Sequence, residues 1–319
     1  MIDTKKSIML NNHMHKCHWR TADRTLPILI SLHGGPGIPN RHSMFTNHRE
    51  LCNFFTVVAY DQRGCGGSYY NCDPKTLTLD TYIEDLHALV QYFTKLFDQD
   101  KVILLGGSWG TELGTIYAHK YPEYVRAYVG YGQVVDGFLN EEHSYNYVYE
   151  KIKESNNSED LKELEKVGPP VKGCYKPVYQ GLRKQRDLLS KYGGHSMEKT
   201  TIFESLVKPV FLSGEYSIKD IYGFIKGVKF TLENSWPSIV NYNFMEDTYK
   251  FDVPIYIFQG RHDYTTPSTL IKDYYDKIEA PDKRLIWFEN SAHGPLSEEK
   301  EKFYEYLFKY VLKGETYEK

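Results

Sequence analysis

The chain has 319 residues, of which 41% are hydrophobic and 25% are charged, a composition that is ordinary for a soluble globular protein. Lysine and arginine number 39 against 42 aspartates and glutamates, which gives a formal net charge of −3. This balance indicates neither nucleic acid nor an anionic membrane as a partner. No apolar run approaches the roughly 18 residues of a membrane span. The length suffices for one large core with an inserted subdomain.

The N-terminus and the cysteines bear on location. Residues 1–6 are not followed by a signal-type apolar stretch, and the five scattered cysteines form no C-x-x-C pair, which favours reduced thiols. We therefore expect a cytoplasmic protein. His13, His15 and Cys17 alternate along one predicted strand, but a single hairpin supplies no second set of ligands. We expect no metal and no other cofactor.

In the N-terminal part of the chain, strands end at motifs of small and polar residues. Four runs rich in branched and aromatic residues predict strands: 7–10, 13–20, 27–32 and 55–60. Asn11-Asn12 predicts a hairpin turn between the first two. HGGPG at 33–37 follows the third strand and DQRGCGGS at 61–68 the fourth. Apolar residues spaced by three and four over 78–97 predict a helix packed on a sheet.

The pentapeptide GGSWG at 106–110 matches G-x-S-x-G, the nucleophile elbow between a strand and a helix. It follows the apolar run 102–105, typical of a strand buried on both faces of a parallel sheet. The segment 111–121 then predicts a helix. Glycine at positions 106 and 110 gives the turn the room it needs. We interpret Ser108 as a catalytic nucleophile.

A serine nucleophile needs a base and an acid that orients the base. Asp263 follows the predicted strand 253–258, and His293 follows the strand 284–288 in a loop marked by Gly-Pro. The order serine, acid, histidine is that of the α/β-hydrolases. His262 is an alternative base, but as the neighbour of Asp263 it is expected to point elsewhere from the strand end.

An acyl transfer also needs backbone N–H groups that face the developing oxyanion. The amide of Trp109, directly after the nucleophile, is one expected donor. The glycine-rich loop 33–37 offers the second. Pro36 has no N–H, so Gly35 is the better candidate.

The motifs at 33–37, 61–68 and 106–110, with GRHD at 260–263 and SAH at 291–293, occur in one order. Together they resemble the proline iminopeptidase (prolyl aminopeptidase) branch of the α/β-hydrolases, over roughly residues 7–131 and 250–312. The resemblance implies an α/β fold: a mostly parallel central sheet flanked by helices, with an inserted helical lid. It also implies Ser108, Asp263 and His293 as the triad, Gly35 and Trp109 as oxyanion donors, and the DQRG loop as structural support.

We expect the core at 1–132 and 248–319 and the lid at 133–247. In the family a Trp- and Glu-containing lid motif supplies carboxylates for the substrate's free amino group, and this chain does not clearly show that motif. Several acids of the lid are candidates instead: Glu141, Glu142, Glu215 and Glu233. Glu233 is preferred because it lies near Phe230 and Trp236, aromatic residues suited to a proline pocket.

The leading hypothesis is an aminopeptidase that releases N-terminal proline or another small residue from peptides by an acyl-enzyme mechanism. A carboxylesterase, amidase or lactonase acting on a small uncharged acyl substrate is the second. A non-catalytic ligand-binding α/β-hydrolase is a remote third, which a complete triad disfavours. The oligomeric state does not follow from the sequence.

Overall fold

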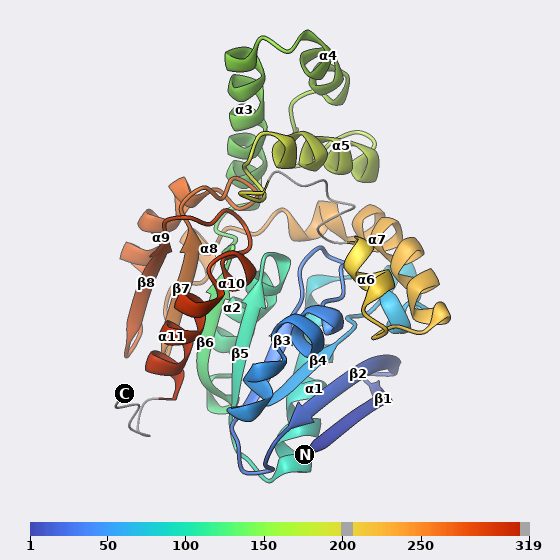
Figure 1. The fold of residues 1–319 in the computed structure, drawn as a ribbon, viewed down its shortest axis with the longest axis vertical. Helices are drawn as coiled ribbons and strands as arrows, with labels where there is room; N and C mark the ends of the chain where they lie inside the picture. The colour runs from blue at the N-terminus through green and yellow to red at the C-terminus, as the bar shows by residue number, and fades with distance from the viewer. Residues whose placement is uncertain (199–206, 313–319) are drawn as a thin grey trace.

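The computed structural model describes residues 1–198 and 207–312 of the chain. One eight-stranded sheet forms its centre, in the order β1-β2-β4-β3-β5-β6-β7-β8 (Figure 1). The strands are β1 (Ile2–Leu10), β2 (His13–Thr21), β3 (Ile28–Leu32), β4 (Thr56–Tyr60), β5 (Val102–Gly107), β6 (Val125–Tyr131), β7 (Ile255–Gly260) and β8 (Lys283–Phe288). β1 pairs antiparallel with β2 and β2 with β4, while the other pairs are parallel. The expected α/β-hydrolase architecture is confirmed.

Helices cover both faces of this sheet. On one face α1 (Leu79–Phe97) and α2 (Trp109–Lys120) pack against alternate strand residues such as Leu104. On the other face α11 (Lys300–Val311) packs against the intervening residues such as Leu105. Because β3, β4 and β5 are buried along their whole length, they consist mainly of apolar residues on both faces, as parallel strands do.

The turn between β1 and β2 follows from its two asparagines. Asn11 and Asn12 have φ of 45° and 58°, a left-handed conformation that asparagine tolerates better than most residues. The predicted hairpin is therefore present, and it attaches an antiparallel edge to the parallel sheet.

A helical insertion separates β6 from β7. Its helices are α3 (Gly137–Ser155), α4 (Ser158–Val167), α5 (Val178–Lys191), α6 (Lys208–Leu212), α7 (Ile218–Ile239) and α8 (Phe244–Asp247). α3, α4 and α5 project away from the sheet, whereas α7 lies against its flank (Figure 1). Asn156 ends α3 in a left-handed conformation and Asn157 caps α4, so these two helices separate at adjacent asparagines. No helix in the described ranges is both long and apolar enough to cross a membrane.

The remaining helices are short and follow the last two strands: α9 (Ile271–Lys277) comes after β7, and α10 (Pro295–Glu298) after β8. The last helix of the described residues, α11, buries Phe303, Tyr304, Leu307 and Val311.

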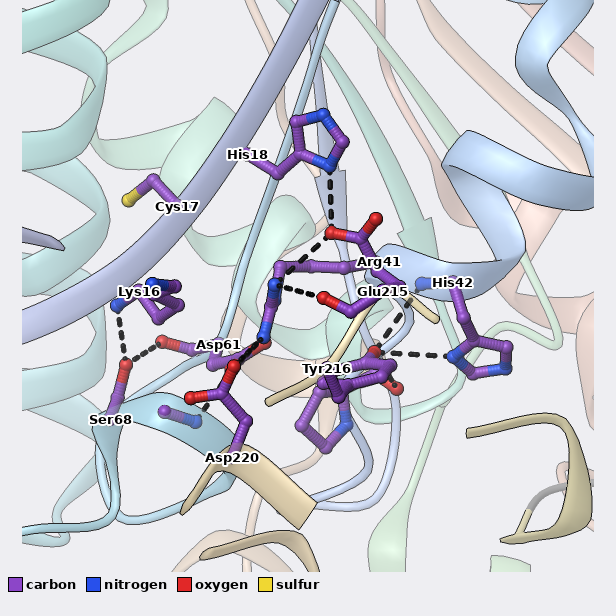
Figure 2. A network of polar contacts seen from close by, with 12 residues as sticks. Lys16, Cys17, His18, Arg41, His42, Asp61, Ser68, Glu215, Tyr216 and Asp220 are labelled. Atoms are coloured by element: carbon purple, nitrogen blue, oxygen red, sulfur yellow. Dashed lines mark hydrogen bonds and ion pairs between the residues drawn. The ribbon is translucent and has the colours of Figure 1, made fainter. Parts of the chain in front are cut away.

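A fully buried arginine joins the insertion to the sheet (Figure 2). Arg41 donates to both carboxylate oxygens of Asp61, at 2.8 and 3.1 Å, to Glu215 at 3.1 Å and to Asp220 at 3.2 Å. Burial disfavours the charge on Arg41, but the adjacent Asp61 carboxylate outweighs it and raises the arginine pKa. Glu215 also lies 2.8 Å from His18 Nδ1. The start of α7 is thus fixed to the core by paired, desolvated charges.

Candidate active site

Ser108 lies in the sharp turn between β5 and α2 with φ 54° and ψ −126°. This conformation is strained for a non-glycine residue, by about 1–3 kcal/mol. A Cβ on Gly106 would lie 2.6 Å from the Gly110 carbonyl oxygen, and one on Gly110 would lie 2.0 Å from that of Leu32. Both positions therefore require glycine, because any side chain would clash with neighbouring backbone atoms. The geometry is that of a nucleophile elbow.

Asp263 and His293 are brought together from two different loops. His293 Nδ1 lies 2.8 Å from Asp263 Oδ2. Asp263 is completely buried and accepts further hydrogen bonds from Gln259, from the amide of Thr265, and from the amide and hydroxyl of Thr266. These donors stabilise an ionised carboxylate and fix its direction toward the imidazole.

The end of β6 lies against both Ser108 and His293. The Ser108 amide donates to the Tyr131 carbonyl oxygen at 3.0 Å. A Cβ on the next residue, Gly132, would lie 2.7 Å from His293 Cε1. Ser108 and the imidazole therefore approach one short segment of backbone. His262, the alternative base, is exposed.

The glycine-rich loop passes over the elbow. A Cβ on Gly34 would lie 3.1 Å from Ser108 Cβ, and Gly35 has φ 116°, a value that side-chain-bearing residues rarely adopt. The amide of Trp109 is at the first position of α2, where N–H groups have no partner within the helix. Gly35 is thus the neighbour of a residue in contact with Ser108, and Trp109 directly follows Ser108 in the chain.

His33 and Gln62 hold this loop in place. Gln62 donates its amide to His33 Nε2 at 3.0 Å and its side-chain nitrogen to the His33 carbonyl at 3.0 Å. Burial lowers the pKa of His33 to about 4, so the ring is neutral. Because Nε2 accepts a hydrogen bond, the proton is on Nδ1, which then donates to the Gly34 carbonyl at 2.9 Å. The DQRG segment therefore supports the loop from behind.

His195, from the helical insertion, belongs to this site and was missed in the sequence. Its carbonyl accepts the amide of His293 at 3.0 Å, and the two imidazole rings are 5.3 Å apart. Its Nδ1 lies 2.9 Å from Thr265 Oγ1. Burial, and then the proximity of His293, lower the His195 pKa to about 3. A GGHS loop far from any predicted strand end offered no signal for this role.

The candidate acidic residues of the insertion differ in how deeply their side chains are buried. Glu233 is exposed on α7 and lies 3.7 Å from Lys229, so the structure does not place it in a buried pocket. Glu142 is also exposed, and Glu215 is committed to Arg41 and His18. Glu141 is 1% exposed and pairs through Oε1 with Arg186.

No group of three or more histidine, cysteine, aspartate or glutamate side chains suited to a metal ion occurs within residues 1–198 and 207–312. His13 and His15 instead hydrogen bond to the carbonyls of Ser68 and Asp61. Cys65 is buried, and burial raises its pKa well above the usual range, which makes it an unreactive thiol.

Known proteins resemble the chain over nearly its whole length. A probable aminopeptidase, YbaC, from Bacillus subtilis is 30% identical over 303 residues, covering 93% of this chain and 90% of its own. The chain belongs to the α/β-hydrolases, in the proline iminopeptidase branch. A family model described as alpha/beta hydrolase fold matches residues 27–166. A proline iminopeptidase from Saccharolobus solfataricus is 28% identical over 291 residues, covering 89% of this chain and 84% of its own.

Solved structures agree on the fold of this hydrolase. The crystal structure of a proline iminopeptidase from Mycobacterium smegmatis superimposes with a TM-score of 0.68, covering 97% of this chain and 98% of its own at 19% identity. VinJ gives a TM-score of 0.68 at 20% identity over the same shares of the two chains. Both matches include the helical insertion, so the whole described architecture recurs in other proteins.

Proposed function

We propose that this hydrolase is a cytoplasmic serine aminopeptidase that releases N-terminal proline or another small residue from peptides. The names of its relatives and the Asp263–His293 hydrogen bond beside the Ser108 elbow support this proposal. Ser108 is the nucleophile, His293 the general base and then acid, and Asp263 orients the imidazole. The insertion, with proposed bounds 133–247, is the lid that excludes water and selects the substrate.

The reaction has two acyl-transfer steps. His293 takes the Ser108 hydroxyl proton as the oxygen attacks the carbonyl carbon of the first residue. The amides of Gly35 and Trp109 donate to the resulting oxyanion, each contributing about 3 kcal/mol to transition-state stabilisation. His293 then protonates the leaving amine, and the acyl-enzyme forms. Water, deprotonated by His293, releases the amino acid and restores Ser108.

The environment of Glu141 is the observation that favours an aminopeptidase over an esterase. Its Oε2 is buried and, among the described residues, has no hydrogen-bond partner. The buried oxygen Oδ1 of Asn140 is equally without a partner in the described structure, and Asn140 Nδ2 lies 3.4 Å from Glu141 Oε1. The Tyr175 hydroxyl interacts with the same carboxylate. A buried carboxylate oxygen beside a buried amide oxygen suits an ammonium group, which brings three donors and a positive charge.

This cluster is attached to the catalytic loop. Asn140 donates to the Thr265 carbonyl at 2.8 Å, and the Thr265 amide donates to Asp263 at 2.8 Å. A substrate amine held at Glu141 therefore lies on the Asp263 side of the site. On this basis we replace Glu233 by Glu141 as the preferred amine-binding acid.

Hydrolysis of proline p-nitroanilide, N-acetyl-proline p-nitroanilide and p-nitrophenyl acetate tests the class. We expect turnover of the free-amine anilide, loss of turnover on N-acetylation, and a decrease of about four orders of magnitude or more in kcat for Ser108→Ala. Turnover of the acetate ester alone would leave a serine esterase and overturn the aminopeptidase. No turnover of any acyl substrate would favour a binding protein.

A matched pair of variants tests the amine site. Glu141→Gln should lower kcat/KM for proline p-nitroanilide by about 10- to 100-fold, the value of a hydrogen bond to a charged group, and leave p-nitrophenyl acetate turnover intact. Glu142→Gln, at the exposed neighbour, should change neither. Equal losses on both substrates for Glu141→Gln would indicate a structural role instead.

A further inference from the structure

The outer side of α6 and α7 exposes large apolar side chains. Ile218, Tyr222 and Ile225 are 89%, 52% and 51% exposed and are spaced by four and three residues, so they form one stripe along α7. On α6, Phe211 and Leu212 are 46% and 73% exposed. Both helices lie on the flank of the molecule, away from α3 and α4 (Figure 1). Clustered exposed apolar side chains of this size usually mark an interaction surface.

Most exposed charges of the segment that carries this apolar stripe are positive, and Glu233 on the next turn of α7 is the exposed exception. Within residues 207–232, all of which the structure describes, the exposed charged side chains are Lys208, Lys219, Lys226 and Lys229. The two acids of the same segment, Glu215 and Asp220, are buried and paired with Arg41. By helix geometry Lys219 and Lys226 flank the stripe on one side. Lys229 is partly neutralised by Glu233 at 3.7 Å.

The surface is held in place by packing. Val210 of α6, Tyr216 of the connecting segment and Phe224 of α7 form a small core beneath this face. A capping box of Ser217 and Asp220 starts α7, and the Arg41 ion pairs hold that start against the sheet. The side chain of Ile218 is therefore exposed at the start of a helix whose N-terminus is held by hydrogen bonds and ion pairs.

We propose that the outer face of α6 and α7 docks on an anionic lipid surface. An amphipathic helix with large apolar residues on one face and lysines beside them lies in the membrane interface, and each lysine near anionic headgroups adds to the attraction. A second copy of the chain fits less well, because two lysine-lined faces would repel each other. The net charge of −3 does not oppose this inference, since it sums over the whole chain and the acids of this segment are buried.

Co-sedimentation of the full chain with vesicles tests the proposal. We expect binding to phosphatidylglycerol–phosphatidylcholine vesicles, little binding to pure phosphatidylcholine, and weaker binding at 0.5 M salt, where screening shortens the reach of the lysines. Ile218→Glu with Ile225→Glu should lower the partition coefficient about tenfold or more. Val171→Glu, at an apolar side chain 68% exposed outside α6 and α7, should not.

Turnover of a soluble ester or anilide serves as the folding control, because Ile218 and Ile225 are outside the proposed catalytic machinery. Wild-type protein that binds neither vesicle, or a doubly substituted variant that binds as wild type does, would overturn the proposal. Light scattering that shows a dimer in solution, dissociated by the same double substitution, would also overturn it and assign the face to self-association.

Discussion

Gln62 Oε1 accepts a hydrogen bond from Trp109 Nε1 at 2.8 Å. The same side chain donates to the His33 carbonyl, so one buried glutamine connects the residue after Ser108 to the glycine-rich loop. The two proposed oxyanion donors, Gly35 and Trp109, therefore share a single support. The relative position of Gly35 and Trp109 therefore depends on hydrogen bonds to Gln62, which lies outside both of their loops.

Gln62→Met should impair both activity and stability. The substitution leaves the Trp109 indole N–H and the His33 carbonyl buried without partners, at a cost of about 1–3 kcal/mol each. We expect a lower midpoint in urea unfolding and a decreased kcat with p-nitrophenyl acetate. Gln91→Met, on the exposed side of α1, is the control. Unchanged kcat in Gln62→Met would show that the bridge does not position the oxyanion donors.

His195→Ala should lower kcat about tenfold with little change in KM. The backbone hydrogen bond from the His293 amide to the carbonyl of residue 195 remains, but the ring that packs against the His293 imidazole is lost. His195→Asn offers an amide near the position of Nδ1 and should partly restore kcat through Thr265. Steady-state kinetics with proline p-nitroanilide measures both. A rise in KM alone would assign His195 to substrate binding instead.

Arg41→Met should be strongly destabilising. Removing the guanidinium leaves the buried carboxylates of Asp61 and Asp220 without their cation, while Glu215 keeps Lys5 and His18. Breaking a buried ion pair costs about 3–5 kcal/mol. Arg183→Met removes an exposed pair with Asp187 at 3.9 Å and should cost less than about 0.5 kcal/mol. Urea unfolding followed by tryptophan fluorescence compares the two. Equal stabilities would show that the network contributes nothing net.

Glu112, one turn after Ser108 on α2, should make stability depend on pH. The side chain is buried and its Oε1 has no partner in the described structure, and burial raises its pKa well above 4.5. As pH rises above 4.5, the unfolded chain loses this proton while the folded chain keeps it. Folding stability therefore falls by about 1.4 kcal/mol per pH unit until the folded pKa is reached.

Glu112→Gln cannot ionise, so its stability relative to wild type should increase with pH over that window. The two proteins should be closest near pH 4.5 and differ more at pH 7. Urea unfolding at several pH values measures the difference, in which the contributions of other groups cancel. A stability difference that does not change with pH would contradict a raised pKa for Glu112.

The sequence by itself determined the local geometry of this protein. The asparagines at 11–12, the glycines at 106 and 110, and the apolar runs of β3, β4 and β5 act over a few residues, through backbone conformation and contact with the nearest strand. That is why the hairpin, the elbow and the strands that precede the motifs could be predicted. The loops that carry Asp263 and His293 followed from the ends of two recognisable strands.

Tertiary structure decided which acidic side chains of the insertion are buried and which are exposed. Nothing local distinguishes Glu141 from Glu142, and Glu233 has aromatic neighbours in sequence, yet only Glu141 is buried with an unpartnered oxygen. Arg41, one partner of Glu215, is 174 residues away in the chain. His195 meets His293 because the insertion contacts the loops that follow β7 and β8. Burial and charge pairing of these groups depend on how segments distant in the sequence pack together. Neither can be predicted from a short stretch of sequence.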